Sequence, residues 1–182
     1  SRVMETLEQL LPNVERYSID EAFADVSGLS RDRLVELCHL VSRRVLRHTG
    51  IQVSIGVART KTLAKVANRM AKRSPELAGV CIGTEPLSFS RVLEQMDTVD
   101  DWGIGRKISV KLAELGITTA RQLRDAEPEW IKRRFSVVLM RTVLELRGES
   151  CLELEDPEES MKSLMCGRSF GTPLKELEDI RP

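Results

Sequence analysis

The succession of patterns between residues 31 and 73 restricts the possible folds of this chain most. Residues 31–48 place apolar side chains three and four positions apart, which is the spacing of an amphipathic helix. Apolar residues then alternate strictly from Ile51 to Val57 and predict a strand, and Thr60 can cap a helix that runs to Arg73. A helix, a strand and a helix in succession need a sheet against which the helices pack. This part of the chain is therefore predicted to be an α/β unit.

The rest of the chain divides into two further parts. Residues 2–11 predict a helix, residues 14–26 extended structure and residues 80–82 a short strand, which completes a sheet with packed helices over residues 1–85. From about residue 88 only short helical patterns follow, at 88–96, 106–115, 119–126, 128–135 and 136–147. We therefore predict an α+β fold class, with a mixed sheet and helices over residues 1–85, a small all-α domain over residues 86–150 and a linker with a further element over residues 151–182.

Composition excludes several classes of protein. No apolar stretch is long enough to span a bilayer, and the first residues lack the architecture of a secretion signal, so we expect a cytoplasmic protein without a membrane segment. The 4 cysteines contain no C-x-x-C pair, which argues against a zinc site and a disulfide scaffold. The 28 basic residues balance the 28 acidic ones, which at first argues against a nucleic-acid partner.

The distribution of charge along the chain reverses that argument. All charged residues between Arg59 and Arg73 are basic, and basic residues also outnumber acidic ones over residues 102–150. The balancing acids lie mainly in residues 83–101 and 151–182. Segregated blocks of this kind are typical of a surface with one phosphate-binding face, although solvated helix faces would also explain them.

Two adjacent carboxylates, Asp20 and Glu21, interrupt an apolar and strand-like run. In a regular strand they would point to opposite faces, so that one of them would be buried in the core at a cost of several kcal/mol. A hairpin turn at this dipeptide would place both at one edge of a sheet, where they could share Mg²⁺ ions and phosphate oxygens. The alternative is a polar hairpin turn without a ligand.

The helix that starts after Thr60 carries Thr62, Lys65, Arg69 and Lys72 at three- and four-residue spacing. With no acid in this window, the face they share cannot be neutralised locally, and a polyanion such as a triphosphate or a nucleic-acid backbone would remove the repulsion. A merely exposed basic helix face is the alternative.

A glycine-rich segment, Trp102-Gly-Ile-Gly-Arg-Lys107, precedes a further helix and fits a helix-hairpin-helix module. A tight turn at Gly103 and Gly105 would direct backbone N–H groups outward at the helix start, where a DNA phosphate can bind. Gly116 suits the end of that helix, and Thr118 or Thr119 can cap the next one. The predicted DNA-binding residues are Gly103, Ile104, Gly105, Arg106, Lys107 and Lys111.

These three elements, in this order, resemble the Y-family translesion DNA polymerases of the UmuC type, which include the ImpB, MucB and SamB relatives. The resemblance is carried by Glu15-Arg-Tyr-Ser-Ile-Asp-Glu-Ala-Phe23, by Gly56-Val-Ala-Arg-Thr-Lys-Thr-Leu-Ala-Lys-Val-Ala-Asn68 and by Val99-Asp-Asp-Trp-Gly-Ile-Gly-Arg106. The segments Met70–Lys72, Glu145–Glu149 and Arg168–Gly171 also match, so that the resemblance covers nearly the whole chain.

The resemblance implies a role for each part. Residues 1–85 would be part of the polymerase palm, residues 86–150 the thumb, and residues 151–182 a linker and the start of the little finger. Asp20 and Glu21 would be catalytic ligands of two Mg²⁺ ions, and Lys72 and Lys65 would bind the incoming nucleotide. The implied function is error-prone nucleotide transfer from a dNTP to a primer 3′-hydroxyl in the SOS response to DNA damage.

The resemblance also implies what is absent. The family's first palm strand with a third metal-binding Asp, its fingers and most of its little finger lie outside these residues, so we expect a fragment that is inactive by itself and whose open sheet edge could pair in a homodimer. Primer-template DNA is the implied substrate partner, with a UmuD-like accessory protein, RecA and a sliding clamp. The alternative is a non-catalytic protein that binds the DNA backbone; a nucleotide-cyclase-like palm is disfavoured, because it would not need the glycine hairpin.

Overall fold

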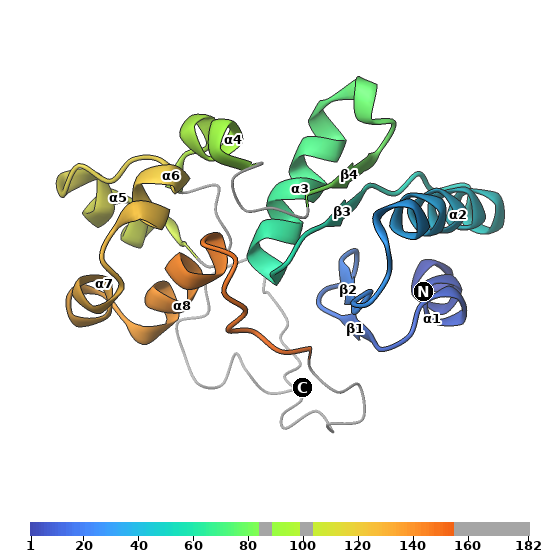
Figure 1. Cartoon of the computed structure of the whole chain (residues 1–182), viewed down its shortest axis with the longest axis horizontal. Helices are drawn as coiled ribbons and strands as arrows, with labels where there is room; N and C mark the ends of the chain where they lie inside the picture. The colour runs from blue at the N-terminus through green and yellow to red at the C-terminus, as the bar shows by residue number, and fades with distance from the viewer. Residues whose placement is uncertain (84–88, 99–103, 155–182) are drawn as a thin grey trace, which may run out of the picture.

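The computed structural model describes residues 1–83, 89–98 and 104–154, which form two neighbouring lobes (Figure 1). The N-terminal lobe contains α1 (Arg2–Leu10), β1 (Val14–Arg16), β2 (Ala22–Ala24), α2 (Arg31–Thr49), β3 (Ile55–Val57), α3 (Lys61–Arg73), the 3-10 helix η1 (Pro75–Leu77) and β4 (Val80–Ile82). The helical lobe contains α4 (Ser90–Gln95), α5 (Arg106–Glu114), α6 (Ala120–Asp125), α7 (Pro128–Arg134) and α8 (Val137–Leu146). The predicted α+β class is confirmed.

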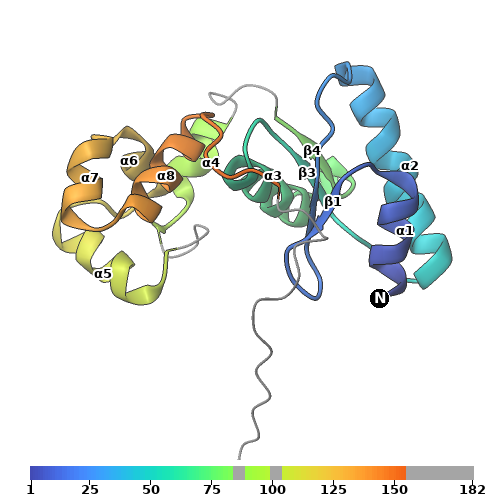
Figure 2. The same cartoon turned by 90° about the horizontal axis from the view of Figure 1, so that it is seen from below.

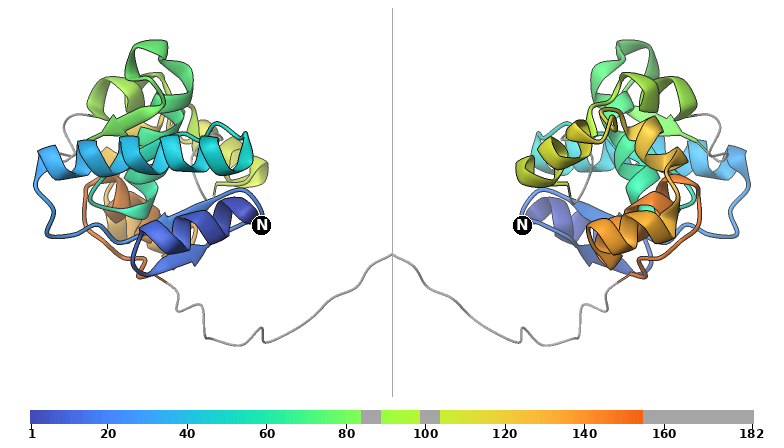
Figure 3. Two further views of the ribbon diagram at one scale, coloured as in Figure 1. Left: turned by 90° about the vertical axis from the view of Figure 1, so that its right-hand side faces the viewer. Right: turned by 90° about the vertical axis from the view of Figure 1, so that its left-hand side faces the viewer.

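The described strands form two separate sheets of two strands each. β1 and β2 pair antiparallel with Val14 opposite Ala24, whereas β3 and β4 pair parallel with Ile55 opposite Val80. The strand predicted over residues 51–57 is therefore paired only in its second half. β4 is three residues long and offers residues 51–54 no ladder partner within the described part of the chain. Helices α1 and α2 lie side by side at the outer end of this lobe (Figure 3).

Helix α3 packs closely against β3, as the sequence predicts. The Thr60 side chain accepts a hydrogen bond from the Leu63 N–H at 3.2 Å, which confirms the predicted N-cap. A Cβ atom on Gly56 would overlap backbone atoms of Asn68 and Ala64, so only glycine allows this approach of strand and helix. Leu63 and its apolar neighbours on α3 are buried against the sheet, and Met70 is partly buried.

A single hydrophobic core continues from α3 into the helical lobe. Leu63 and Val66 of α3 belong to the same cluster of buried residues as Leu112, Leu123 and Ile131. Figure 2 shows α3 and α4 between the sheets and the remaining helices, consistent with this shared core. The two lobes are thus packed against each other through apolar side chains, while the domain boundary at residue 85 stays a prediction.

Side-chain caps fix the starts of α6, α7 and α8 in the helical lobe. Thr119 forms a capping box with Gln122, and the Ser136 hydroxyl accepts a hydrogen bond from the Leu139 N–H. Gly116 has a φ of 80° and follows α5 in a Schellman motif, in which the Ile117 N–H bonds to the Leu112 carbonyl at 2.9 Å. The predicted helices are confirmed to within about two residues at their ends.

Of the linker and further element expected over residues 151–182, only residues 151–154 lie within the described part of the chain. Among the described helices, none has the length and apolar character needed to cross a bilayer.

Candidate active site

The dipeptide of carboxylates lies in the turn that joins β1 to β2, as predicted. The N–H groups of Tyr17 and Ser18 both donate to the Glu21 carbonyl at 3.0 Å and close the turn. The Ser18 hydroxyl donates to a carboxylate oxygen of Asp20 at 2.8 Å and accepts from the Glu21 N–H at 3.1 Å. Local hydrogen bonds of Ser18 therefore hold Asp20 and Glu21 at one end of the sheet.

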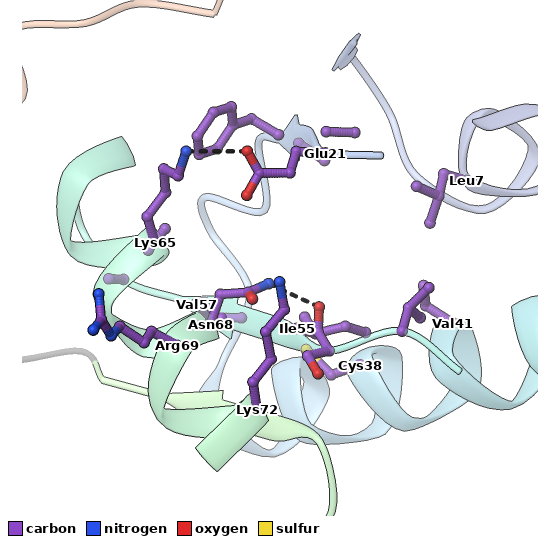
Figure 4. Close-up of a pocket in the computed structure, with 18 of the residues that line it drawn as sticks. Leu7, Glu21, Cys38, Val41, Ile55, Val57, Lys65, Asn68, Arg69 and Lys72 are labelled. Carbon is purple, nitrogen blue, oxygen red and sulfur yellow. Dashed lines mark hydrogen bonds and ion pairs between the residues drawn. The ribbon is translucent and has the colours of Figure 1, made fainter. Parts of the chain in front are cut away.

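Both carboxylates line a pocket of about 990 Å³ that also contains the two predicted nucleotide-binding lysines (Figure 4). Lys65 and Lys72 reach it from α3, while β3 and the extended residues before it form its floor. Asn68 lies between the lysines and donates from its side chain to the Ser54 carbonyl at 2.8 Å. The wall formed by the other elements is largely apolar and includes Leu7, Leu11, Phe23, Leu37 and Val41. The structure thus brings Asp20, Glu21, Lys65 and Lys72 together.

Two ion pairs connect the hairpin to α3. Glu21 contacts Lys65 at 3.1 Å, and the Lys65 ammonium also lies 4.7 Å from the centre of the Tyr17 ring. Glu15 contacts Lys61 at 2.5 Å, and both of these side chains are at least nine-tenths buried. Residues 59–73 contain no acid, as the sequence shows, but the expectation that the basic helix is not neutralised is wrong for the folded protein. Two acids of the hairpin, Glu15 and Glu21, form ion pairs with α3.

Thr62 lies elsewhere than predicted. The sequence places it on the outward basic face of α3, but it is only 1% exposed and is covered by α8. Its backbone N–H donates to the Glu145 carboxylate at 3.1 Å. The exposed end of the basic face consists instead of Lys72 and Arg73, whereas Lys65 and Arg69 are partly buried.

Asp20 and Glu21 are acceptor groups that suit Mg²⁺. Mg²⁺ commonly binds proteins through one or two carboxylates and keeps its other positions for water and phosphate oxygens. No cluster of three or more His, Cys, Asp or Glu side chains suitable for a metal ion occurs among the described residues. Asp20 and Glu21 are thus residues that could hold a divalent ion which also binds phosphate oxygens.

Helix α5, which carries three of the predicted DNA-binding residues, lies on the far side of the helical lobe from β1 and β2 (Figure 1). Gly105 is the N-cap of α5, with an ordinary φ of −74° and open space where a Cβ would lie, so its backbone does not require glycine there. Arg106, Lys107 and Lys111 are exposed. Ile104 is buried in the core, which leaves only its backbone for a contact with DNA, and Gly103 lies outside the described residues.

Asn68 and Glu145 were not predicted as site residues from the sequence. Glu145 occupies a fully buried position in α8 between Val143 and Leu146. A carboxylate within the apolar stripe of a helix is the signal that could have indicated a role, because an ionised side chain in a core requires partners.

Comparison with known proteins finds relatives along the whole chain. Residues 1–69 match the family described as impB/mucB/samB. The whole chain aligns with protein UmuC of Salmonella typhimurium at 43% identity and with protein SamB of the same species at 40%, in each case over 43% of the relative's length. DNA polymerase IV of Brucella melitensis is 33% identical over 99% of this chain and 40% of its own length.

Solved structures of polymerases share the fold. The match to an insertion ternary complex of Dbh DNA polymerase covers 85% of this chain and 44% of the Dbh chain, with a TM-score of 0.68 and 25% identity. DinB from Sulfolobus solfataricus covers 85% of this chain and 45% of its own, with a TM-score of 0.65 and 26% identity. The chain thus spans less than half the length of the relatives that it matches.

Proposed function

Since the chain belongs to the UmuC-type Y-family DNA polymerases, the family of ImpB, MucB and SamB, we propose that it forms palm and thumb parts of an error-prone translesion polymerase. The observation that carries this proposal is the pocket in which Asp20 and Glu21 lie opposite Lys65 and Lys72. Acceptors for a metal and donors for a triphosphate thus meet at one site, as template-directed nucleotide transfer requires.

Each residue of the pocket has a role that follows from its chemistry. Asp20 and Glu21 would hold Mg²⁺, which when bound stabilises the attacking and leaving oxygens of an in-line phosphoryl transfer. Lys72 would bind oxygens of the incoming triphosphate. Lys65 would hold Glu21 through the ion pair in the free protein and line the phosphate-binding face when nucleotide is present.

The exposed cations of α5, two in its first turn and one in its last, support the proposal that the helical lobe holds the duplex. Arg106, Lys107 and Lys111 can contact phosphates of a primer-template together with backbone N–H groups of the glycine hairpin. Such contacts position the duplex and read no base sequence, which suits an enzyme that must accept any template.

The proposal also includes the domain assignment, the partner proteins and the behaviour of the isolated chain. Residues 1–85 would belong to the palm, residues 86–150 to the thumb and residues 151–182 to the linker and little finger of a cytoplasmic enzyme of the SOS response. A UmuD-like protein, RecA and a sliding clamp would be its partners by resemblance, and homodimerisation through an open sheet edge is the proposed behaviour of the isolated chain. We also propose that these 182 residues do not extend a primer alone, because the two carboxylates Asp20 and Glu21 by themselves would bind Mg²⁺ weakly.

Substitution of Asp20 by Asn in a full-length protein that contains this sequence tests the proposal. We expect primer extension to fall at least a hundredfold, because Asn keeps the size of the side chain and removes the charge that holds the metal, while duplex affinity stays unchanged. Asp25→Asn is the matched control, since it makes the same change at an exposed carboxylate of the same segment that does not line the pocket, and it should leave primer extension unchanged. Primer extension that is unaffected by Asp20→Asn would favour the non-catalytic DNA-binding alternative.

A further inference from the structure

A buried carboxylate joins the helical lobe to the start of α3. Glu145 of α8 is fully buried, and its side chain accepts hydrogen bonds from three backbone N–H groups. These donors are Thr62 of α3 at 3.1 Å and, in the segment after α8, Cys151 at 2.6 Å and Leu152 at 3.2 Å. Backbone donors thus satisfy a group that would otherwise be costly to bury.

The backbone of Glu145 adds a second connection at the same place. Its carbonyl accepts a hydrogen bond from the Thr60 hydroxyl at 2.9 Å, while the same hydroxyl caps Leu63. Both connections reach the first turn of α3, where backbone N–H groups have no acceptor within the helix. The first turn of α3 is therefore held by one residue that is more than eighty positions away in the chain.

The orientation of α3 determines where its cations lie in the pocket. Lys65 is one turn beyond Thr62, and Lys72 is about three turns beyond it. Because a helix moves as a stiff rod, a rotation or shift at its first turn displaces these side chains relative to Glu21 on the hairpin. Glu145 also occupies the helix N-terminus with a negative charge, so that phosphates in the pocket must be bound by side chains of α3 rather than by its N-terminus.

We propose that Glu145 is a positioning residue that couples the helical lobe to the pocket by holding α3 in the orientation that sets Lys65 and Lys72 opposite the carboxylates. The consequence for catalysis rests on the proposed function, whereas the coupling itself does not.

Hydrogen exchange on the 182-residue chain tests the coupling without requiring any enzymatic activity. Glu145→Gln keeps the shape and replaces one acceptor oxygen by a donor, so we expect amide exchange at Thr62 or at Cys151 and Leu152 to become about ten to a hundred times faster. Arg147→Met is the control, because it removes two hydrogen bonds to Arg124 and Ala126 that lie wholly within the helical lobe. Unchanged exchange at all three amides in Glu145→Gln would overturn the coupling.

Kinetics of a full-length protein that contains this sequence test the positioning role. We expect Glu145→Gln to raise the KM for dNTP about tenfold while duplex affinity stays within twofold, and Arg147→Met to leave this KM unchanged. A KM equal to that of the wild type would overturn the positioning role. An unmodified protein without any polymerase activity would instead refute the proposed function, and the exchange experiment would still decide the coupling.

A second pair of variants keeps the test valid if Glu145→Gln does not fold. Thr60→Val removes the hydroxyl that bonds to the Glu145 carbonyl, and Thr60→Ser retains it in a smaller side chain. Loss of the N-cap alone would speed exchange only within α3, so the readout is the pair of amides on the other side of Glu145. Faster exchange at Cys151 and Leu152 in the valine variant, restored in the serine variant, supports the coupling; equal exchange at these amides in the two variants contradicts it.

Discussion

Replacement of Lys61 by Met should destabilise the protein far more than loss of an exposed ion pair. The Lys61 ammonium lies 2.5 Å from the Glu15 carboxylate, with side-chain exposures of only 10% and 8%, and it also donates to the Glu153 carbonyl at 2.7 Å. Met fills a similar volume but leaves the buried carboxylate without the Lys61 cation. Removal of one partner from a buried pair costs about 3–5 kcal/mol.

Thermal unfolding of the 182-residue chain measures this effect. In a domain of this size 1 kcal/mol shifts the melting temperature by about 2–4 °C, so we expect a decrease of roughly 6–20 °C. The double variant Glu15→Gln with Lys61→Met should recover much of this loss, because it removes both charges. Arg16→Met is the control, since Arg16 pairs with Glu8 at the surface and its loss should leave the melting temperature nearly unchanged. Equal shifts for Lys61→Met and Arg16→Met would refute the reasoning.

Three further predictions follow from single positions. Gly56→Ala should lower the free energy of unfolding by about 1–3 kcal/mol because its Cβ overlaps the backbone of α3, whereas Gly105→Ala should not change it, as chemical denaturation can show. Lys107→Ala should reduce the slope of log affinity for duplex DNA against log salt by about one without changing the melting temperature; an unchanged slope would exclude Lys107 from phosphate contact. Burial raises the pKa of the Cys38 thiol from 9.0 to about 11, so the folded state holds this proton longer than the unfolded chain. Its contribution to stability is therefore complete below about pH 9 and is lost as the pH rises towards 11, and Cys38→Ala should flatten this loss in denaturation curves measured between these pH values.

Local patterns in the sequence were sufficient for most elements and for part of the site. The hairpin turn at Asp20 and Glu21 was predictable because two adjacent carboxylates cannot both leave the core of a regular strand. The start of α3 at Thr60 and the end of α5 at Gly116 follow from capping preferences within a few residues of chain. Such features depend on neighbours in sequence, and they are present in the folded protein where the sequence places them.

Contacts between distant segments decided the rest. The pairing of Glu15 with Lys61 joins residues 46 positions apart, and that of Glu145 with Thr62 joins residues 83 positions apart. Periodicity assigned Thr62 to the basic face because helical spacing gives the direction in which a side chain points from the helix axis. It does not give which other segment of the chain packs against that face. The packing of α8 against α3 buries Thr62 and places the Glu145 carboxylate where it accepts hydrogen bonds from backbone N–H groups. The sequence by itself thus determined which residues carry charge and where helices begin, and only the tertiary structure decided which charges meet, because burial and pairing depend on segments that the chain brings together when it folds.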